Sequence, residues 1–167
     1  MSVPYNETIL QAVLAELQKI DQATGFNFTA KEVRRFDVRE RLPTQPLGLS
    51  LSARPHFLLS YGGQSKRVVG LTHHVSLRFQ VQGLLPALEE CPELTSDELV
   101  ALIEEDIYVA LAAACDPEQD APLPYATLEE TDSVPVHDED EAGVYDGVRV
   151  RVVVHYKHDF KNRATVI

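Results

Sequence analysis

Apolar residues recur every three or four positions in two segments of the chain, which predicts two amphipathic helices. The first segment runs from Asn6, a candidate N-cap, to Gly25, a candidate helix stop. The second begins at Thr95, where Glu98 completes the pattern of a capping box, and Pro117 prevents its continuation. The predicted buried positions are Ile9, Leu10, Val13, Leu14, Leu17 and Ile20 in the first helix and Leu99, Leu102, Ile103, Ile107, Ala110, Leu111 and Ala114 in the second.

Elsewhere apolar and polar positions alternate, which is the period of a β-strand with one buried face. Residues 33–39 predict a short edge strand with basic residues around it. Residues 56–60 predict the outgoing strand of a hairpin, and the paired glycines within residues 61–65 predict its tight turn. The return strand has an apolar face and a polar face, formed by Val75, Leu77, Phe79 and Val81 and by Ser76, Arg78, Gln80 and Gln82.

A second hairpin closes the chain. Residues 125–136 predict its first strand and residues 137–143 its acidic tip. The last strand has the apolar face Val148, Val150, Val152, Val154 and Tyr156 and an opposite face of Arg149, Arg151, His155 and Lys157 with Val153 among them. An apolar face of this regularity belongs inside a sheet covered by helices. The proline-rich residues 42–55 predict an irregular surface loop, and residues 159–167 predict a flexible or partner-docking tail.

These elements predict an α+β fold: a mainly antiparallel sheet with two helices packed on one face and a long hairpin with an acidic tip. The chain has 167 residues, which is the size of one domain. We find no sequence repeat and no interdomain linker. Residues 1–167 are therefore expected to form a single domain.

Charge is distributed unevenly along the chain, whose net charge is -11. Residues 1–83 hold 10 basic and 6 acidic residues, a net charge of +4, whereas residues 84–167 hold 5 basic and 20 acidic residues, a net charge of -15. No Lys or Arg occurs between Arg78 and Arg149. Such a surface repels phosphate backbones, which argues against sequence-specific nucleic-acid binding. A molecule of two signs favours head-to-tail packing, although two solvated patches explain the charges equally well.

The sequence contains no recognisable catalytic or metal-binding motif. The six histidines lack an HExxH pattern, and residues 61–67 lack the spacing of a phosphate-binding loop. Cys91 and Cys115 flank a helix of about 27 Å, too long for a disulfide between its ends, so we expect two free thiols. No apolar run is long enough to span a bilayer, and the N-terminus does not follow the pattern of a signal peptide. We expect a cytosolic protein without cofactor, metal or membrane partner.

Three segments carry a resemblance to a known family. They are the opening helix ILQAVLAELQKI, the strand HHVSLRFQVQG with the capped helix LTSDELVALIEEDIYVALAA, and the final strand YDGVRVRVVVHYKHD. In this order they span most of the chain and resemble the tail terminator (tail-completion) proteins of long-tailed bacteriophages. The proline-rich residues 42–55 and the long acidic arm depart from the usual pattern of this family.

The resemblance implies a non-enzymatic virion protein at the head-tail interface, assembled in the host cytoplasm. Such a protein forms a ring, commonly a hexamer, that caps the tail tube, stops its polymerisation and offers a docking surface to a head-completion or neck protein. DNA would pass through the ring, and an acidic channel wall would let it do so without sticking.

Eight charged residues are the candidates for the assembly interfaces. They are Arg78, Arg149, Arg151, Lys157, Asp138, Glu139, Asp140 and Glu141. Charge reversal at Arg149 and Arg151 is expected to weaken ring assembly. Two alternatives stay open: another neck component, such as a head-closure or adaptor subunit, and a small α+β ligand-binding protein or enzyme with a pocket between the sheet and residues 42–55.

Overall fold

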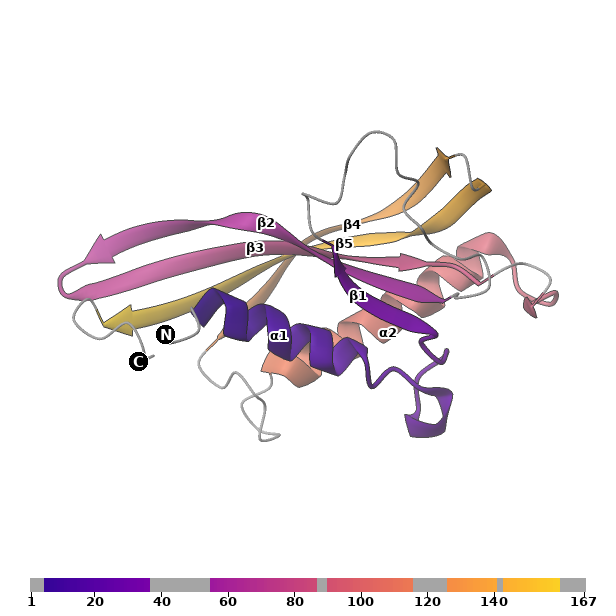
Figure 1. The fold of residues 1–167 in the computed structure, drawn as a ribbon, viewed down its shortest axis with the longest axis horizontal. Coiled ribbons are helices and arrows are strands. Elements are labelled where there is room, and N and C mark those ends of the chain that lie inside the picture. Colours follow the sequence, from indigo (N-terminus) through magenta and orange to yellow (C-terminus); the bar gives the residue numbers. More distant parts are fainter. Residues whose placement is uncertain (1–4, 37–54, 87–89, 116–125, 141–142, 160–167) are drawn as a thin grey trace.

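A computed structural model describes residues 5–36, 55–86, 90–115, 126–140 and 143–159 of the chain. Within them two helices lie on one face of a five-stranded sheet (Figure 1). The helices are α1 (Tyr5–Leu17) and α2 (Ser96–Cys115), and a short 3-10 helix, η1 (Gln22–Thr24), follows α1. The strands are β1 (Glu32–Phe36), β2 (His56–Val69), β3 (Thr72–Leu84), β4 (Thr127–Asp140) and β5 (Gly143–Asp159). The predicted α+β fold is confirmed.

The sheet has the strand order β1-β2-β3-β5-β4. β1 pairs with β2 in parallel, and every other pair of neighbours is antiparallel. The prediction that the first strand lies at a sheet edge is therefore confirmed. The central pair, β3 and β5, stays in register from Thr72 opposite Asp159 to Leu84 opposite Gly147. The turn of the β2–β3 hairpin consequently lies at one end of the sheet and the turn of the β4–β5 hairpin at the other (Figure 1).

The core lies between the helices and the inward faces of the central strands. All five residues of the predicted apolar face of β5 are buried, with exposed fractions from 0% to 5%, and the four of β3 are at 0% to 2%. They form one cluster with the buried stripes of both helices. Burying one such aliphatic or aromatic side chain contributes about 1.5–3 kcal/mol. Alternation in the strands and helical spacing together therefore account for the core.

The turn predicted at residues 61–65 is wrong. β2 continues through these residues to Val69, and the chain reverses at Gly70, whose φ of 64° is in the left-handed region. The glycine pair instead accommodates a β-bulge, because the register with β3 shifts between Tyr61 and Gly63. Gly63 has a φ of 105°, which other residues rarely adopt. A glycine pair is compatible with both a tight turn and a β-bulge. Here the bulge forms, because it lets β2 stay paired with β3 as far as Val69.

The predicted end of the first helix is also wrong, because α1 ends at Leu17 and not near Gly25. Gly25, with a φ of 97°, closes η1, while the Asp21 side chain accepts a hydrogen bond from the Ala23 N–H at the start of η1. Ile20 is buried all the same. At the other end, Asn6 lies inside the first turn of α1, where its Oδ1 accepts from the Glu7 N–H at 2.9 Å.

The capping box at the start of α2 is confirmed. The Glu98 Oε2 accepts the Thr95 N–H at 2.8 Å, and the Thr95 Oγ1 accepts the Glu98 N–H at 3.3 Å. The Thr95 N–H and the Thr95 hydroxyl, which donates to the same Oε2 at 2.8 Å, lower the pKa of Glu98 below its usual value. Cys91 and Cys115 are free thiols, as predicted. Pro117, most of the loop predicted at residues 42–55 and the tail beyond residue 159 lie outside the described residues.

A buried carboxylate joins α2 to the segment that leads into β1. Asp106 is 1% exposed, and its Oδ1 accepts the Asn27 N–H at 2.8 Å while its Oδ2 accepts the Phe28 N–H at 3.0 Å. Burial raises the pKa of Asp106, and the two N–H donors partly oppose that rise. Because both carboxylate oxygens accept backbone N–H groups, Asp106 fixes the position of residues 27 and 28 just before β1.

We expect Asp106→Ala to lower the free energy of unfolding by about 2–4 kcal/mol, because two inward-facing N–H groups lose their acceptor. The matched control is Glu105→Ala at the neighbouring exposed carboxylate, which is expected to cost less than about 1 kcal/mol. Urea unfolding of the three proteins measures both changes. Equal losses in the two variants would contradict the role given to Asp106.

Candidate functional site

The candidate site is the face of the sheet that the helices leave uncovered, named here the open face. Because side chains alternate along a strand, the residues between the buried valines of β5 point to this face. The predicted basic residues Arg149, Arg151 and Lys157 are among them, and Arg78 reaches the same face from β3. The structure therefore brings the four basic candidates together on one surface.

Only one of the four basic candidates has an acidic partner within the described part of the chain. The Arg151 Nη1 lies 3.0 Å from the Asp132 Oδ2, and both side chains are substantially exposed. An exposed pair of this kind contributes little to stability. Among the described residues, Arg78, Arg149 and Lys157 have no ion pair, and the buried Nε of Arg149 has no hydrogen-bond partner. These three side chains keep donors available for an incoming carboxylate.

The open face also contains buried apolar side chains. Leu58, Leu84 and Val153 are 6%, 2% and 9% exposed, yet none belongs to the cluster under the helices. The strand register places Val153 between Arg78 on β3 and Glu129 on β4. Charged side chains of the open face thus lie next to apolar side chains, and the aliphatic stem of an arginine packs well on an apolar side chain.

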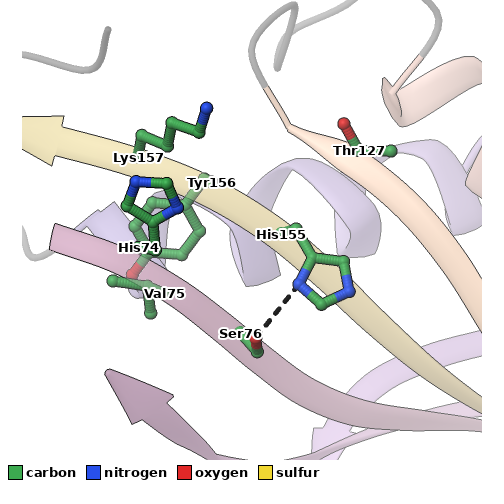
Figure 2. A pocket seen from close by; sticks show the side chains of 7 residues that line it. All are labelled: His74, Val75, Ser76, Thr127, His155, Tyr156 and Lys157. Atoms are coloured by element: carbon green, nitrogen blue, oxygen red, sulfur yellow. Dashed lines mark hydrogen bonds between the residues drawn. The ribbon is translucent and has the colours of Figure 1, made fainter. Parts of the chain in front are cut away.

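A hollow of about 400 Å³ lies on the sheet near the β2–β3 hairpin (Figure 2). Its lining residues are His74, Val75, Ser76, Thr127, His155, Tyr156 and Lys157. The Ser76 Oγ lies 3.0 Å from the His155 Nδ1, shown as a dashed line in Figure 2. On its other side, the His155 Nε2 lies 2.7 Å from the Glu129 Oε2. A continuous hydrogen-bonded chain, named here the polar clasp, therefore crosses β3, β5 and β4.

The polar clasp was missed by the sequence analysis. Ser76 and His155 are 79 positions apart and meet because they are opposite each other in the β3–β5 register. Glu129 joins them from β4, where it is opposite Val153. No local spacing connects the three residues. Only knowledge of the strand order and register would have found them.

The order serine, histidine, carboxylate is that of an activated nucleophile. Acyl transfer also needs donors aimed at the developing oxyanion. The strand at Ser76 is paired on both sides, with Ser65 of β2 and with His155 of β5. Its backbone N–H groups are therefore used in strand pairing and do not serve as such donors. Within the described residues, the clasp therefore ties three strands together and holds Glu129 on the open face.

The acidic candidates lie at the far end of the sheet. Asp138, Glu139 and Asp140 end β4 opposite Tyr145, Val144 and Gly143, and Glu141 lies outside the described residues. Arg149 is opposite Val134, four positions before Asp138. The structure thus places the basic candidates on one face of the sheet and the strand positions of the acidic arm beyond the Arg149 end of that face.

A comparison of the chain with models of known protein families and with curated proteins finds no match. Among the described residues, no group of three or more His, Cys, Asp or Glu side chains is arranged to hold a metal ion. None of the helices that the structure describes has the length and apolar character needed to cross a membrane. Burial raises the pKa of the Cys115 thiol to about 11, so this thiol stays protonated at neutral pH.

We expect neutral His155 to carry its proton on Nε2, because an ionised Glu129 can only accept and Ser76 can donate to Nδ1. The ¹⁵N shifts of the ring at pH 8 measure this tautomer. Glu129→Ala removes the acceptor and should mix the two tautomers. The matched control is Asp132→Ala, which removes a carboxylate of the same strand that pairs elsewhere. A proton on Nδ1 in the unmodified protein would show that the clasp is assigned wrongly.

Proposed function

We propose that this chain is the ring-forming terminator subunit of a phage-type tail, which caps the tail tube, stops its polymerisation and provides a docking surface for the head. The observation that carries the proposal is the open face, where Arg78, Arg149 and Lys157 have no acidic partner among the described residues. A surface of unpaired cations on a rigid sheet is suited to contact another protein.

The opposite side of the molecule supplies the complementary charge. α2 contains no Lys or Arg, and its side chains Asp97, Glu98 and Glu105 are exposed. The outer side of α2 is thus acidic, whereas the open face carries the cations together with Glu129 and Asp132. Copies that meet through two different surfaces form head-to-tail contacts, which generate a ring when the rotation closes.

The mechanism of such a subunit is steric and adhesive. A ring seated on the last layer of tail tube subunits covers the surface on which the next layer would add, so polymerisation stops. Its other side is then available to a head-completion or neck protein. The resemblance to tail terminators supports a hexamer, these two partners, and a place in the virion at the head-tail interface. No cofactor takes part in this mechanism.

Another neck component, such as a head-closure or adaptor subunit, would use the same open face. The alternative of a small ligand-binding protein or enzyme is favoured by a different observation, the hollow with its polar clasp. The two classes predict different species in solution. An assembly subunit gives discrete oligomers or binds tube ends, whereas a ligand-binding protein is stabilised by a small molecule as a monomer.

We expect the double variant Arg149→Glu and Lys157→Glu to raise the concentration needed for ring assembly by at least about tenfold, which corresponds to about 1.4 kcal/mol. Reversal of these unpaired cations turns attraction into repulsion across the contact. Arg151→Glu should have a smaller effect, because Arg151 already pairs with Asp132. Sedimentation velocity across a concentration series measures assembly, and a tube-elongation assay measures capping.

The matched control is Lys19→Glu, which reverses an exposed cation just beyond α1, away from the open face. It should assemble and cap like the unmodified protein. Rings of unchanged size and salt resistance in the Arg149 and Lys157 variant would exclude the open face as an assembly surface.

A further inference from the structure

The tip of the β2–β3 hairpin exposes an unusual amount of apolar surface. Val68, Val69 and Leu71 are 55%, 47% and 66% exposed, and they make up half of the large exposed hydrophobic residues in the described part of the chain. Single exposed apolar residues are common on protein surfaces, but a group of three within four positions is a candidate site of interaction.

The tip is exposed because it extends past the helix layer (Figure 1). Tyr5, at the start of α1, packs against Tyr156 with ring centroids 4.7 Å apart, and Tyr156 is opposite Val75 in the register. Farther along, Lys66 and Val68 have the strand parity of the buried face and are exposed all the same. Neither described helix therefore covers the end of this hairpin, named here the prong.

The prong is positively charged. Lys66 and Arg67 flank its apolar tip, both are exposed, and no Asp or Glu occurs anywhere in β2 or β3. Within the described residues neither cation has an ion pair. A fitting partner surface must therefore combine an exposed apolar centre with acidic neighbours.

The outer face of α2 has this combination. Val109 is 49% exposed, and Glu105 lies one helical turn before it on the same exposed face. Asp97 continues this face toward the start of the helix, with the exposed small residues Ala101 and Ala112 leaving room for a partner side chain. Since α2 contains no Lys or Arg, this surface matches the prong in both polarity and sign.

We propose that the β2–β3 prong of one copy docks on the outer face of α2 of the next copy, with Leu71 and Val68 on Val109 and with Lys66, which shares the strand face of Val68, directed at Glu105. The contact joins two copies because the prong extends away from the helix layer of its own chain (Figure 1). Each copy offers one prong and one α2 face, so the contact is heterologous and repeats from copy to copy. This inference rests on the proposed assembly function and adds the prong to the open face as a second surface that contacts the α2 side of the next copy.

The test uses Leu71→Asp, which damages the prong, and Val109→Asp, which damages the α2 face. Both positions are exposed, so both variants are expected to keep the circular dichroism of the unmodified protein. Each variant alone should stay monomeric in sedimentation velocity under conditions where the unmodified protein assembles. An equimolar mixture should give a 1:1 dimer, because one intact prong meets one intact α2 face and the chain of contacts then stops.

The matched control is Ala15→Asp on α1, where the native alanine is exposed and lies outside the prong, the α2 face and the open face. It should assemble like the unmodified protein. Independent support would come from Leu71→Cys combined with Val109→Cys in a Cys91→Ser background, which is expected to form disulfide-linked oligomers in the double variant and monomers in each single one.

Leu71→Asp and Val109→Asp proteins that assemble normally, or a mixture that stays monomeric, would overturn this contact. The proposed function can fail independently of the prong contact. If the Leu71→Asp and Val109→Asp proteins assemble normally while Arg149→Glu with Lys157→Glu abolishes tube capping, the prong contact is wrong and the capping function stands. If the prong variants lose assembly while the unmodified protein does not stop tube growth, the contact is right and the capping function is wrong.

Discussion

The pairing of β3 with β5 is the interaction on which the rest of the structure depends. It holds the two strands in register from Thr72 opposite Asp159 to Leu84 opposite Gly147. Because both strands alternate in phase, the inward-facing buried residues of β3 are opposite inward-facing buried residues of β5, and the helices cover that face. The same phase places the basic residues of both strands on the open face. A shift of one residue would bury Arg149 and Arg151 and expose the valines.

Much of the fold could be predicted because its signals are local. The inward faces of β3 and β5, the buried stripes of the helices and the capping box at Thr95 all depend on spacing within one element. The bulge at Gly63 and the early end of α1 could not be predicted in this way. A glycine permits several backbone conformations, and which one forms depends on strand pairing and packing elsewhere in the chain.

The candidate site likewise has one part that local spacing predicts and one part that depends on long-range contacts. The basic face was predicted, because the parity of β5 alone puts Arg149, Arg151 and Lys157 on one side. The polar clasp depends on three strands meeting, and the bonds of Asp106 to the segment before β1 join residues 78 and 79 positions apart. Long-range hydrogen bonds of this kind leave no trace in local spacing. They became visible only once the strand order was known.

The charge imbalance along the sequence acquires a spatial meaning in the fold. Exposed acidic residues of α2 lie on the helix side, whereas the cations of β3 and β5 lie on the open face beside Glu129 and Asp132 of β4. This arrangement is the physical basis of the assembly through two different surfaces that we propose. Native mass spectrometry of the unmodified protein across a salt series tests that claim most directly. We predict a closed oligomer whose mass is a fixed multiple of 18.6 kDa and which dissociates as salt rises. A monomer at every concentration, or a dimer insensitive to salt, would contradict it.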